Sequence, residues 1–351
     1  MISIKHYLKN ANLSIDNHYG KNVNGFIRSR ELIKMMFNSI LFRFETKEYY
    51  YYSLSEKTHK EKRELLPKYY QARWYYQVNS NYAIKVTSDK WTSYKLYEPF
   101  YQRDAFVYNP NETADADLSI FYKDYDFYAS GMKFLKEHNR FFVKPLDGDS
   151  GIGAKIVESM PEEADRVLEK LKKDYTDGFI AEELIKQSSE LEKYHPKSVN
   201  TLRIQTIYYN NDRIEIMYPC LRMGRGGAVI DNANSGGLFA AIDRESGKTI
   251  AASDELGRDY YEHPDTKLPL VGINVPHWKE ACELSIELAK KLPECKIIGW
   301  DLALTDKGWV LVEINSLPLL IYQIASHKGI RREMEQVVSE LLKEKQESSG
   351  N

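Results

Sequence analysis

The residues Ile297–Pro318, with the sequence IIGWDLALTDKGWVLVEINSLP, decide the fold of this chain. Two short apolar runs flank Asp306-Lys307-Gly308, where Gly308 can adopt the positive φ that a three-residue hairpin loop usually needs. The stretch therefore predicts an antiparallel hairpin in which Thr305 faces Trp309 across the turn. The register that follows pairs Leu304 with Val310, Ala303 with Leu311, Asp301 with Glu313, and Gly299 with Asn315.

Side chains of a strand alternate between its two faces, so this register gives the hairpin one apolar face and one polar face. The apolar face comprises Ile298, Trp300, Leu302, Val310, Val312 and Ile314. The opposite face comprises Gly299, Asp301, Ala303, Glu313 and Asn315. Because directly opposed carboxylates repel each other, a positive group is expected between Asp301 and Glu313, and a divalent cation such as Mg²⁺ prefers oxygen ligands of this kind. The alternative is an exposed hairpin face whose acidic residues point to water.

Length and composition limit the classes of function. A chain of 351 residues is expected to form two or three lobes, and 42% hydrophobic with 28% charged residues is typical of a globular protein in water. A net charge of -2 predicts neither a nucleic-acid-binding surface nor a polybasic membrane patch. No apolar run approaches the ~20 residues needed to span a bilayer. The N-terminus lacks the apolar core of a signal peptide, and the three cysteines lack CxxC spacing, which favours reduced thiols and a cytoplasmic location.

Residues 1–79 are expected to form a mainly helical N-terminal extension without a chemical motif. Apolar side chains recur there at three- and four-residue steps, which is typical of one face of a helix packed against a core. These side chains are Ile33, Met36, Phe37, Ile40, Leu41 and Phe44. Strand-like runs are expected next, at residues 82–86 and 105–108.

A glycine-rich loop between two strand-like runs provides a second candidate site. The runs are FFVKP at 141–145 and AKIVE at 154–158, and the loop LDGDSGIG occupies 146–153. Glycines let backbone N–H groups approach an anion such as phosphate, and the Lys144 ammonium can reach the same oxygens. Gly153 is followed by Ala-Lys rather than Lys-Ser/Thr, so the loop is not a Walker A motif. The alternative is an ordinary hairpin turn.

Three further segments carry residues suited to a nucleotide. DGFIAEELIK at 177–186 predicts an apolar strand that ends in two carboxylates, an edge that can offer backbone groups and a carboxylate to an adenine. SVNTLRIQTIY at 198–208 predicts a strand in which apolar neighbours enclose Arg203, and an arginine there needs a phosphate or carboxylate partner. Arg222 begins a basic, glycine-rich stretch suited to anions, for which the alternative is a surface loop.

The order of these features resembles that of the ATP-grasp superfamily. A lysine precedes a glycine flap, a Glu-Glu strand and a strand arginine follow, and D…E-x-N closes the body. The segments SVNTLRIQT, DNANSGGLFAAID and GWDLALTDKGWVLVEIN are more closely similar to the sugar-transfer-associated ATP-grasp proteins found with bacterial polysaccharide and capsule genes.

The resemblance spans roughly residues 80–335 and implies an α+β fold in which two lobes clamp ATP between antiparallel sheets. It implies an ATP-grasp catalytic body at 80–351, with a small flap lobe at about 120–185 and a metal-bearing large lobe at about 186–335.

The family pattern also implies roles for individual residues, carried over by position. The residues implied to contact the ATP phosphates are Lys90, Lys144, Ser150, Gly151 and Gly153. Those implied to hold the adenine and ribose are Glu182, Glu183, Leu184, Ile185 and Glu190. Those implied to be catalytic are Lys144, which contacts the phosphates, and Arg203 and Arg222, which stabilise the transferred phosphoryl group. Those implied to hold one or two Mg²⁺ ions are Asp301, Glu313 and Asn315.

As a function, the resemblance implies an ATP- and Mg²⁺-dependent carboxylate–amine ligase that acts through an acyl phosphate, with small-molecule or glycan-linked carboxylate and amine substrates. Two alternatives stay open: a kinase that phosphorylates a sugar or other hydroxyl, and a non-catalytic nucleotide-binding scaffold. The kinase would need a base, and His195, His263, His277 and His327 are present without a spacing that singles one out. No nucleic-acid partner and no membrane span are expected, and the sequence leaves the oligomeric state open.

Overall fold

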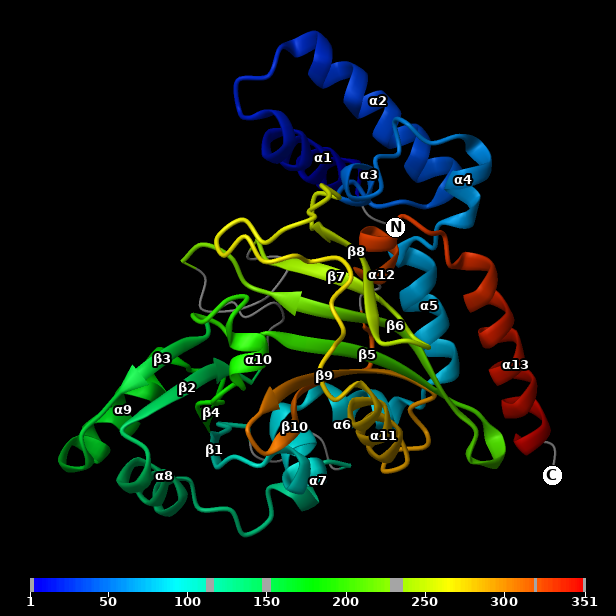
Figure 1. Cartoon of the computed structure of the whole chain (residues 1–351). Helices are drawn as coiled ribbons and strands as arrows, with labels where there is room; N and C mark the ends of the chain where they lie inside the picture. The colour runs from blue at the N-terminus through cyan, green and yellow to red at the C-terminus, as the bar shows by residue number, and fades with distance from the viewer. Residues whose placement is uncertain (1–2, 112–116, 147–152, 228–235, 319–320, 350–351) are drawn as a thin grey trace.

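Two antiparallel sheets form the framework of the computed structural model, which describes residues 3–111, 117–146, 153–227, 236–318 and 321–349 (Figure 1). The larger sheet has six strands in the order β10-β9-β5-β6-β7-β8, and the smaller has four in the order β1-β4-β2-β3. The small-sheet strands are β1 Ala105–Tyr108, β2 Arg140–Pro145, β3 Lys155–Glu158 and β4 Phe179–Glu183. The large-sheet strands are β5 Thr201–Tyr208, β6 Ile214–Met223, β7 Leu238–Asp243, β8 Lys248–Asp254, β9 Ile297–Thr305 and β10 Gly308–Asn315. The expected α+β class with two antiparallel sheets is confirmed.

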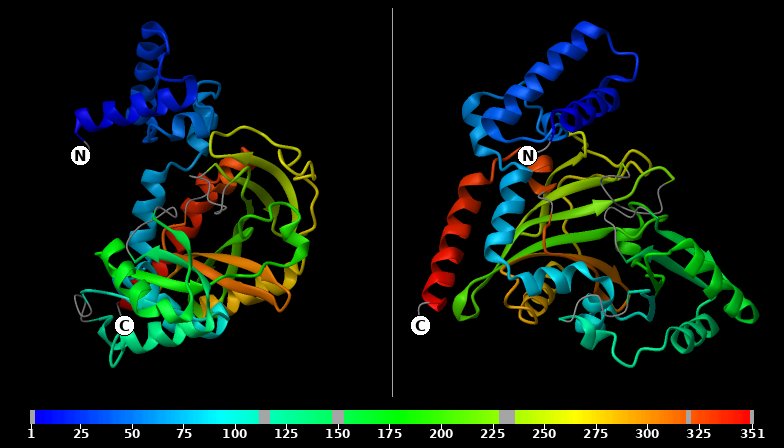
Figure 2. Two further views of the ribbon diagram at one scale, coloured as in Figure 1. Left: turned by 90° about the vertical axis from the view of Figure 1, so that its left-hand side faces the viewer. Right: turned by 180° about the vertical axis from the view of Figure 1, so that it is seen from behind.

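Helices pack on both faces of the larger sheet (Figures 1 and 2). On one face lie α6 Asn81–Ser88, α7 Lys90–Tyr101 and α11 Trp278–Ala289, and on the other lie α5 Lys68–Val78, α12 Ile321–Ser326 and α13 Arg331–Ser349. The smaller sheet is covered by α8 Phe127–Glu137 and α9 Ala164–Asp174. The other helical segments are α1 Ile4–Tyr19, α2 Gly25–Phe42, α3 Glu48–Tyr51, α4 His59–Glu64, η1 Ser119–Phe121, η2 Pro161–Glu163, α10 Ser189–Glu192 and η3 Asn210–Asp212. Within the described residues, no helix combines the length and apolar character that crossing a bilayer requires.

The β9–β10 hairpin forms as predicted, but its turn is one residue shorter. Thr305 pairs with Gly308 rather than Trp309, so the loop consists of two residues, and Gly308 takes φ 105° at the start of β10. A β-bulge between Leu311 and Glu313 inserts one extra residue into β10 and restores the predicted pairing beyond it. The two deviations cancel, so Asp301 still faces Glu313, as predicted.

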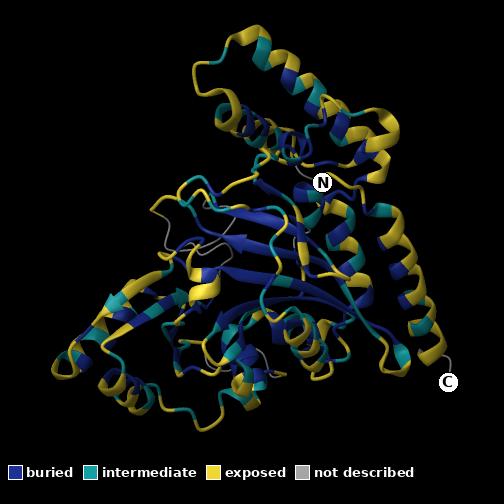
Figure 3. Cartoon of the chain, in the orientation of Figure 1, coloured by how far each residue is buried: buried dark blue, intermediate teal, exposed yellow. Residues whose placement is uncertain are grey.

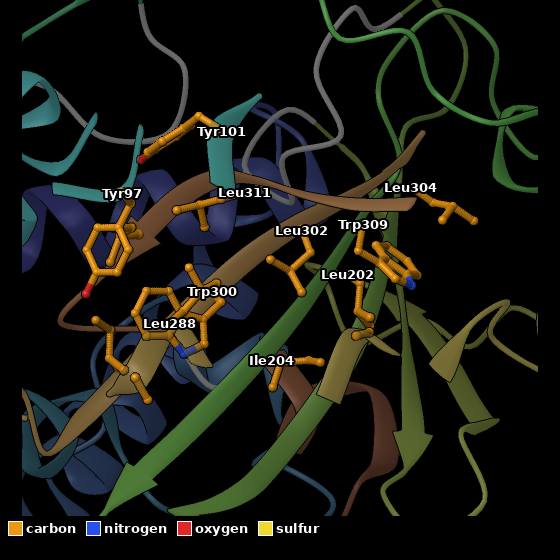
Figure 4. Packing of buried hydrophobic residues seen from close by; sticks show 14 of the residues in the cluster. Tyr97, Tyr101, Leu202, Ile204, Leu288, Trp300, Leu302, Leu304, Trp309 and Leu311 are labelled. Carbon is orange, nitrogen blue, oxygen red and sulfur yellow. The ribbon is translucent and has the colours of Figure 1, made fainter. Parts of the chain in front are cut away.

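The shorter turn changes which side chains share the apolar face before the bulge. Trp309 and Leu311, rather than the predicted Val310 and Val312, pack in the core with the β9 side chains (Figure 4). The core below the hairpin includes Trp300, whose ring lies 5.6 Å from that of Tyr97 and whose Nε1 donates a hydrogen bond to Thr206 over 2.9 Å.

The N-terminal helices α1 and α2 project from the end of the large sheet near β7 and β8 (Figures 1 and 2). The helical extension is present, but the predicted packing of its apolar stripe is wrong. Five of the six residues of that stripe are exposed, and only Phe44, which lies beyond the end of α2, is buried. Instead, α2 turns Glu31, Met35, Asn38 and Phe42 toward the protein.

The strand-like run at 105–108 is β1, whereas the run at 82–86 is part of helix α6. Ser80 caps that helix, because its hydroxyl accepts a hydrogen bond from the N–H of Ala83 over 3.0 Å. Ala83 and Val86, three residues apart, are both fully buried. Capping and burial at helical spacing therefore outweigh the strand-like composition of so short a segment.

Candidate nucleotide- and metal-binding site

Asp301 on β9 is the centre of the candidate site, and two arginines bind its carboxylate. Arg203 lies directly opposite on β5; its Nε donates to Oδ1, and its Nη2 donates to Oδ2 over 2.7 Å. Arg222 on β6 donates from Nη1 to Oδ2 over 2.9 Å. Burial would raise the pKa of Asp301, but the two guanidinium groups outweigh burial and hold that pKa below its ordinary value. The predicted catalytic arginines and the first predicted metal ligand therefore form one buried ionic cluster.

Glu313 and Asn315 complete the polar face of the hairpin beside Asp301. Glu313 is directly opposite Asp301, and Asn315 Nδ2 lies 3.5 Å from Asp301 Oδ2. Two carboxylates and one amide on a single face form a donor set that suits a hard cation such as Mg²⁺, so these residues fit the metal by their chemistry. The positive charge expected beside Asp301 is, however, already supplied by guanidinium groups. A metal bound here would share the Asp301 oxygens with Arg203 and Arg222.

Lys144 on β2 and Glu182 on β4 form a second buried ion pair, with 2.7 Å between Nζ and Oε2. Arg103 Nη2 donates to the other oxygen, Oε1, over 2.8 Å. Burial would raise the pKa of Glu182, but Arg103 and Lys144 outweigh it and lower the pKa to about 2. The side chain of Glu182, predicted to hold adenine, is thus ionised and held between two cations.

Arg103 connects the two sheets at this site, and sequence reasoning did not identify it. Besides binding Glu182 of the small sheet, it donates from Nη1 to the carbonyl of Leu311 over 2.6 Å and from Nη2 to that of Val312 over 3.0 Å. Both carbonyls belong to the bulged part of β10, directly before Glu313. Arg103 stands between the end of α7 and the start of β1 without any motif around it, so only the folded chain reveals the connection.

The residues predicted to contact phosphates lie around the β2–β3 connection. Lys90, the first residue of α7, donates from Nζ to the carbonyl of Leu146 over 2.7 Å. Gly153 adopts φ 78°, and its carbonyl accepts a hydrogen bond from Tyr175 over 2.7 Å. Ser150 and Gly151, also predicted for this role, lie outside the described residues. The two strands predicted on either side of the glycine loop are confirmed, since β2 pairs antiparallel with β3. Residues 147–152 of the loop lie outside the described part of the chain.

The residues predicted for adenine and ribose follow the chain from the small sheet into the large lobe. Glu183 ends β4, and the partly exposed Leu184 and Ile185 come next in an irregular connection. Glu190 is exposed on α10, and its Oε1 lies 3.5 Å from Nε2 of His277. The backbone at 184–185 therefore lies in the connection between the small sheet and the large sheet.

A second group of metal-binding side chain types occurs at the edge of the small sheet. Asp104, His138 and Glu183 present ligand atoms that all lie within 4.8 Å of one another. His138 Nε2 lies 2.9 Å from Asp104 Oδ2, and the Asp104 N–H donates to Glu183 Oε2 over 3.3 Å. These partners account for the cluster without a metal, but any metal-binding experiment must distinguish it from Asp301.

The four histidines considered as kinase bases are all engaged by neighbours. His195 is buried beside Ser198, with Nδ1 2.8 Å from Oγ, and burial lowers its pKa. His263 is buried with Nε2 2.8 Å from the Gly224 carbonyl. The other two lie near carboxylates: His277 is 3.5 Å from Glu190, and His327 is 2.6 Å from Asp259.

Comparison with known families identifies the class. The model of the sugar-transfer-associated ATP-grasp family matches residues 69–339. The protein therefore has an ATP-grasp fold, with its two antiparallel sheets as the two halves of the clamp. More specifically, the chain belongs to the sugar-transfer-associated ATP-grasp family, as the sequence motifs predicted.

Solved structures of ATP-grasp ligases are similar to parts of this chain. D-alanyl-alanine synthetase A from Vibrio cholerae is 15% identical, with a TM-score of 0.45 and coverage of 75% of this chain and 68% of that one. D-alanine-D-alanine ligase from Coxiella burnetii is 13% identical, with a TM-score of 0.44 and coverage of 78% and 62%. The ATP-grasp ligase PsnB is 12% identical, with a TM-score of 0.43 and coverage of 75% and 63%. This chain thus spans less than two thirds of the last two, and a search of curated protein sequences found no match.

Proposed function

We propose that this protein is an ATP- and Mg²⁺-dependent carboxylate–amine ligase that modifies a bacterial cell-surface polysaccharide or its precursor in the cytoplasm. In the proposed reaction, a carboxylate oxygen of the substrate attacks the γ-phosphorus of ATP, and ADP leaves. An amine then attacks the carbonyl carbon of the acyl phosphate, forms the amide bond and releases phosphate. The division into a helical extension at 1–79 and an ATP-grasp body at 80–351 belongs to the same proposal.

The observation that carries the proposal is the convergence of Arg203 and Arg222 on Asp301. Phosphoryl transfer depends on positioning and on neutralising charge around the transferred group, more than on covalent chemistry by the protein. The guanidinium groups of the buried Arg222 and the largely buried Arg203, held beside an ionised carboxylate, are already oriented for that task. In the proposal they stabilise the γ-phosphoryl group, and Asp301, Glu313 and Asn315 hold Mg²⁺, which supplies further positive charge to the phosphate oxygens.

The second ionic cluster supports the placement of the nucleotide. Glu182 fixes the ammonium of Lys144 on the strand that enters the glycine flap, and the ammonium of Lys90 binds the carbonyl of Leu146, where the flap begins. In the proposal, these lysines and the flap residues Ser150, Gly151 and Gly153 bind the phosphates. The adenine then lies against Glu183 and the backbone of Leu184 and Ile185, with Glu190 near the ribose.

Substitution of the metal-binding residues tests the proposal. Glu313→Gln and Asp301→Asn should each abolish Mg²⁺-dependent ATP turnover, whereas Asp306→Asn, in the exposed turn of the same hairpin, should leave it unchanged. His138→Gln should also leave turnover unchanged, because His138 belongs to the other cluster. Retained turnover in Glu313→Gln, or its loss in His138→Gln, would contradict the assignment of the metal to the hairpin.

The products separate a ligase from a kinase. Incubation with ATP, Mg²⁺ and a panel of uronic acids, amino acids and amines, followed by mass spectrometry, should yield an amide with ADP and free phosphate. A stable phosphoester on a hydroxyl acceptor would identify a kinase instead. The engagement of all four candidate histidines by other groups favours the ligase, since a substrate carboxylate needs no base to attack.

A further inference from the structure

One face of α2 carries large apolar side chains that the protein leaves exposed. The exposed fractions are 77% for Phe26, 63% for Ile33, 48% for Met36, 48% for Phe37, 63% for Ile40 and 53% for Leu41. These six residues, called the α2 stripe below, recur at the spacing of one helical face. Figure 3 shows α2 at the end of the molecule away from the small lobe, with exposed residues along its length. An apolar surface of this extent is typical of an interaction site.

The opposite face of α2 is buried although it is more polar. Glu31 is buried, and its Oε1 lies 3.3 Å from Arg30 Nε and 3.6 Å from Lys34 Nζ. The Asn38 side-chain amide donates a hydrogen bond to the Lys34 carbonyl over 2.8 Å. The protein thus buries Glu31 and Asn38 of this helix beside Met35 and Phe42, while five large apolar side chains from Ile33 onward face outward. That inversion indicates that the stripe is covered by something other than the body of this chain.

The charge of the segment that carries the stripe indicates what covers it. Residues 1–44 contain seven basic residues (Lys and Arg) but only two acidic residues (Asp and Glu). The rest of the chain contains 42 basic and 49 acidic residues. Both acidic residues form ion pairs within the segment: Asp16 with Arg28, at 2.6 Å, and Glu31 with Arg30. Lys5, Lys9, Lys21 and Arg43 are exposed. The net charge of the whole chain, -2, therefore conceals a basic apolar segment joined to an acidic body.

We propose that the α2 stripe docks the protein on the surface of an anionic lipid membrane. A helix with an apolar face of Phe, Ile, Leu and Met bordered by Lys and Arg lies in the plane of the headgroups, with its apolar side chains among the acyl chains and its cations near anionic lipids. Arg30 and Lys34 border the stripe and remain 52% and 42% exposed. A symmetric contact with a second copy would instead bring two basic segments together, which like-charge repulsion opposes.

Co-sedimentation of the full chain with vesicles tests this proposal. Vesicles of phosphatidylglycerol and phosphatidylcholine in equal parts should bind the protein, whereas vesicles of phosphatidylcholine alone should bind it weakly. Added salt should weaken binding to the anionic vesicles. Ile33→Ser/Phe37→Ser/Ile40→Ser should reduce binding at least about tenfold, because it removes three apolar anchors. Lys5→Gln/Lys9→Gln/Lys21→Gln should reduce binding to the anionic vesicles only.

A matched control separates the stripe from exposed apolar residues in general. Ile120→Ser/Met160→Ser/Tyr261→Ser replaces three large apolar side chains that are similarly exposed but lie elsewhere, and it should bind vesicles like the wild type. Equal binding by the stripe variant, or no binding by the wild type, would overturn the proposal. So would a wild-type dimer that the stripe substitutions convert to a monomer, because a second copy would then cover the stripe.

Discussion

The β9–β10 hairpin and helix α2 both carry a periodic apolar face, yet only the hairpin buries it. In the hairpin, Trp300 and Leu302 are fully buried, whereas in α2 the corresponding positions, such as Ile33 and Ile40, are 63% exposed. The apolar face of the hairpin lies against α6, α7 and α11, while α2 projects beyond the sheet (Figure 1). The difference teaches that periodicity identifies an element and its faces, whereas the chain path decides which face is covered.

The largest effect on stability is expected from the polar face of the hairpin. Asp301→Ala leaves the guanidinium groups of Arg203 and Arg222 buried without their carboxylate, and breaking a buried ion cluster in this way costs about 3–5 kcal/mol. Urea unfolding should show this loss, and Asp306→Ala in the exposed turn should change stability by less than about 0.5 kcal/mol. A loss for Asp301→Ala as small as that control would mean that the arginines find other partners.

A slightly smaller effect is expected from the apolar face. Leu302 is fully buried in the core under the hairpin (Figure 4), and Leu302→Ala should destabilise the protein by about 3 kcal/mol through lost burial and the cavity left behind. Val310→Ala provides the comparison, because the sequence predicted Val310 for this face and the shorter turn places Leu311 there instead. Thermal unfolding should therefore show that Leu311→Ala destabilises the protein more than Val310→Ala does. The reverse order would support the register predicted from the sequence.

The sequence predicted the hairpin and its central carboxylate pair because these depend on local spacing. The family followed from the resemblance of its motifs to those of known proteins. The sequence did not predict the bulge at Val312, because one extra residue in β10 is compensated by the shorter turn. Nor did it predict that Asp301 is bound by two arginines, although it required a carboxylate or phosphate for Arg203. Arg103 was missed entirely, since its partners Glu182 and Leu311 come together only through tertiary packing.

Two buried glutamates extend the comparison to pH. Glu182 in the site lies between cations that lower its pKa, whereas Glu48 in the N-terminal segment is buried among groups that do not offset desolvation, so its pKa rises to about 7. Its carboxylate accepts hydrogen bonds from the N–H groups of Glu45 and Lys68, at 2.7 and 2.8 Å, and so joins α3 to the start of α5.

A raised pKa in the folded state means that stability is fully present below the unfolded value and is lost as pH rises through about 7. Glu48→Gln, which keeps one acceptor oxygen, should therefore gain roughly 2 kcal/mol over the wild type between pH 5 and pH 8. Chemical unfolding at both pH values measures this difference, with the exposed Glu56→Gln as the control. If the free energies of unfolding of the wild type and the variant change in parallel between the two pH values, Glu48 is charged in the folded protein at both.

The smallest effect on stability is expected from the α2 stripe, and it tests the comparison most directly. Ile40→Ser should change the free energy of unfolding by less than about 0.5 kcal/mol, because the side chain has little contact to lose. Met35→Ser, on the buried face of the same helix, should cost about 2 kcal/mol or more. If Ile40→Ser costs as much as Met35→Ser, the stripe is covered in the protein on its own, and the contrast with the hairpin disappears. If the two differ as expected, the apolar face of α2 contributes nothing to folding, and its role lies in what it contacts.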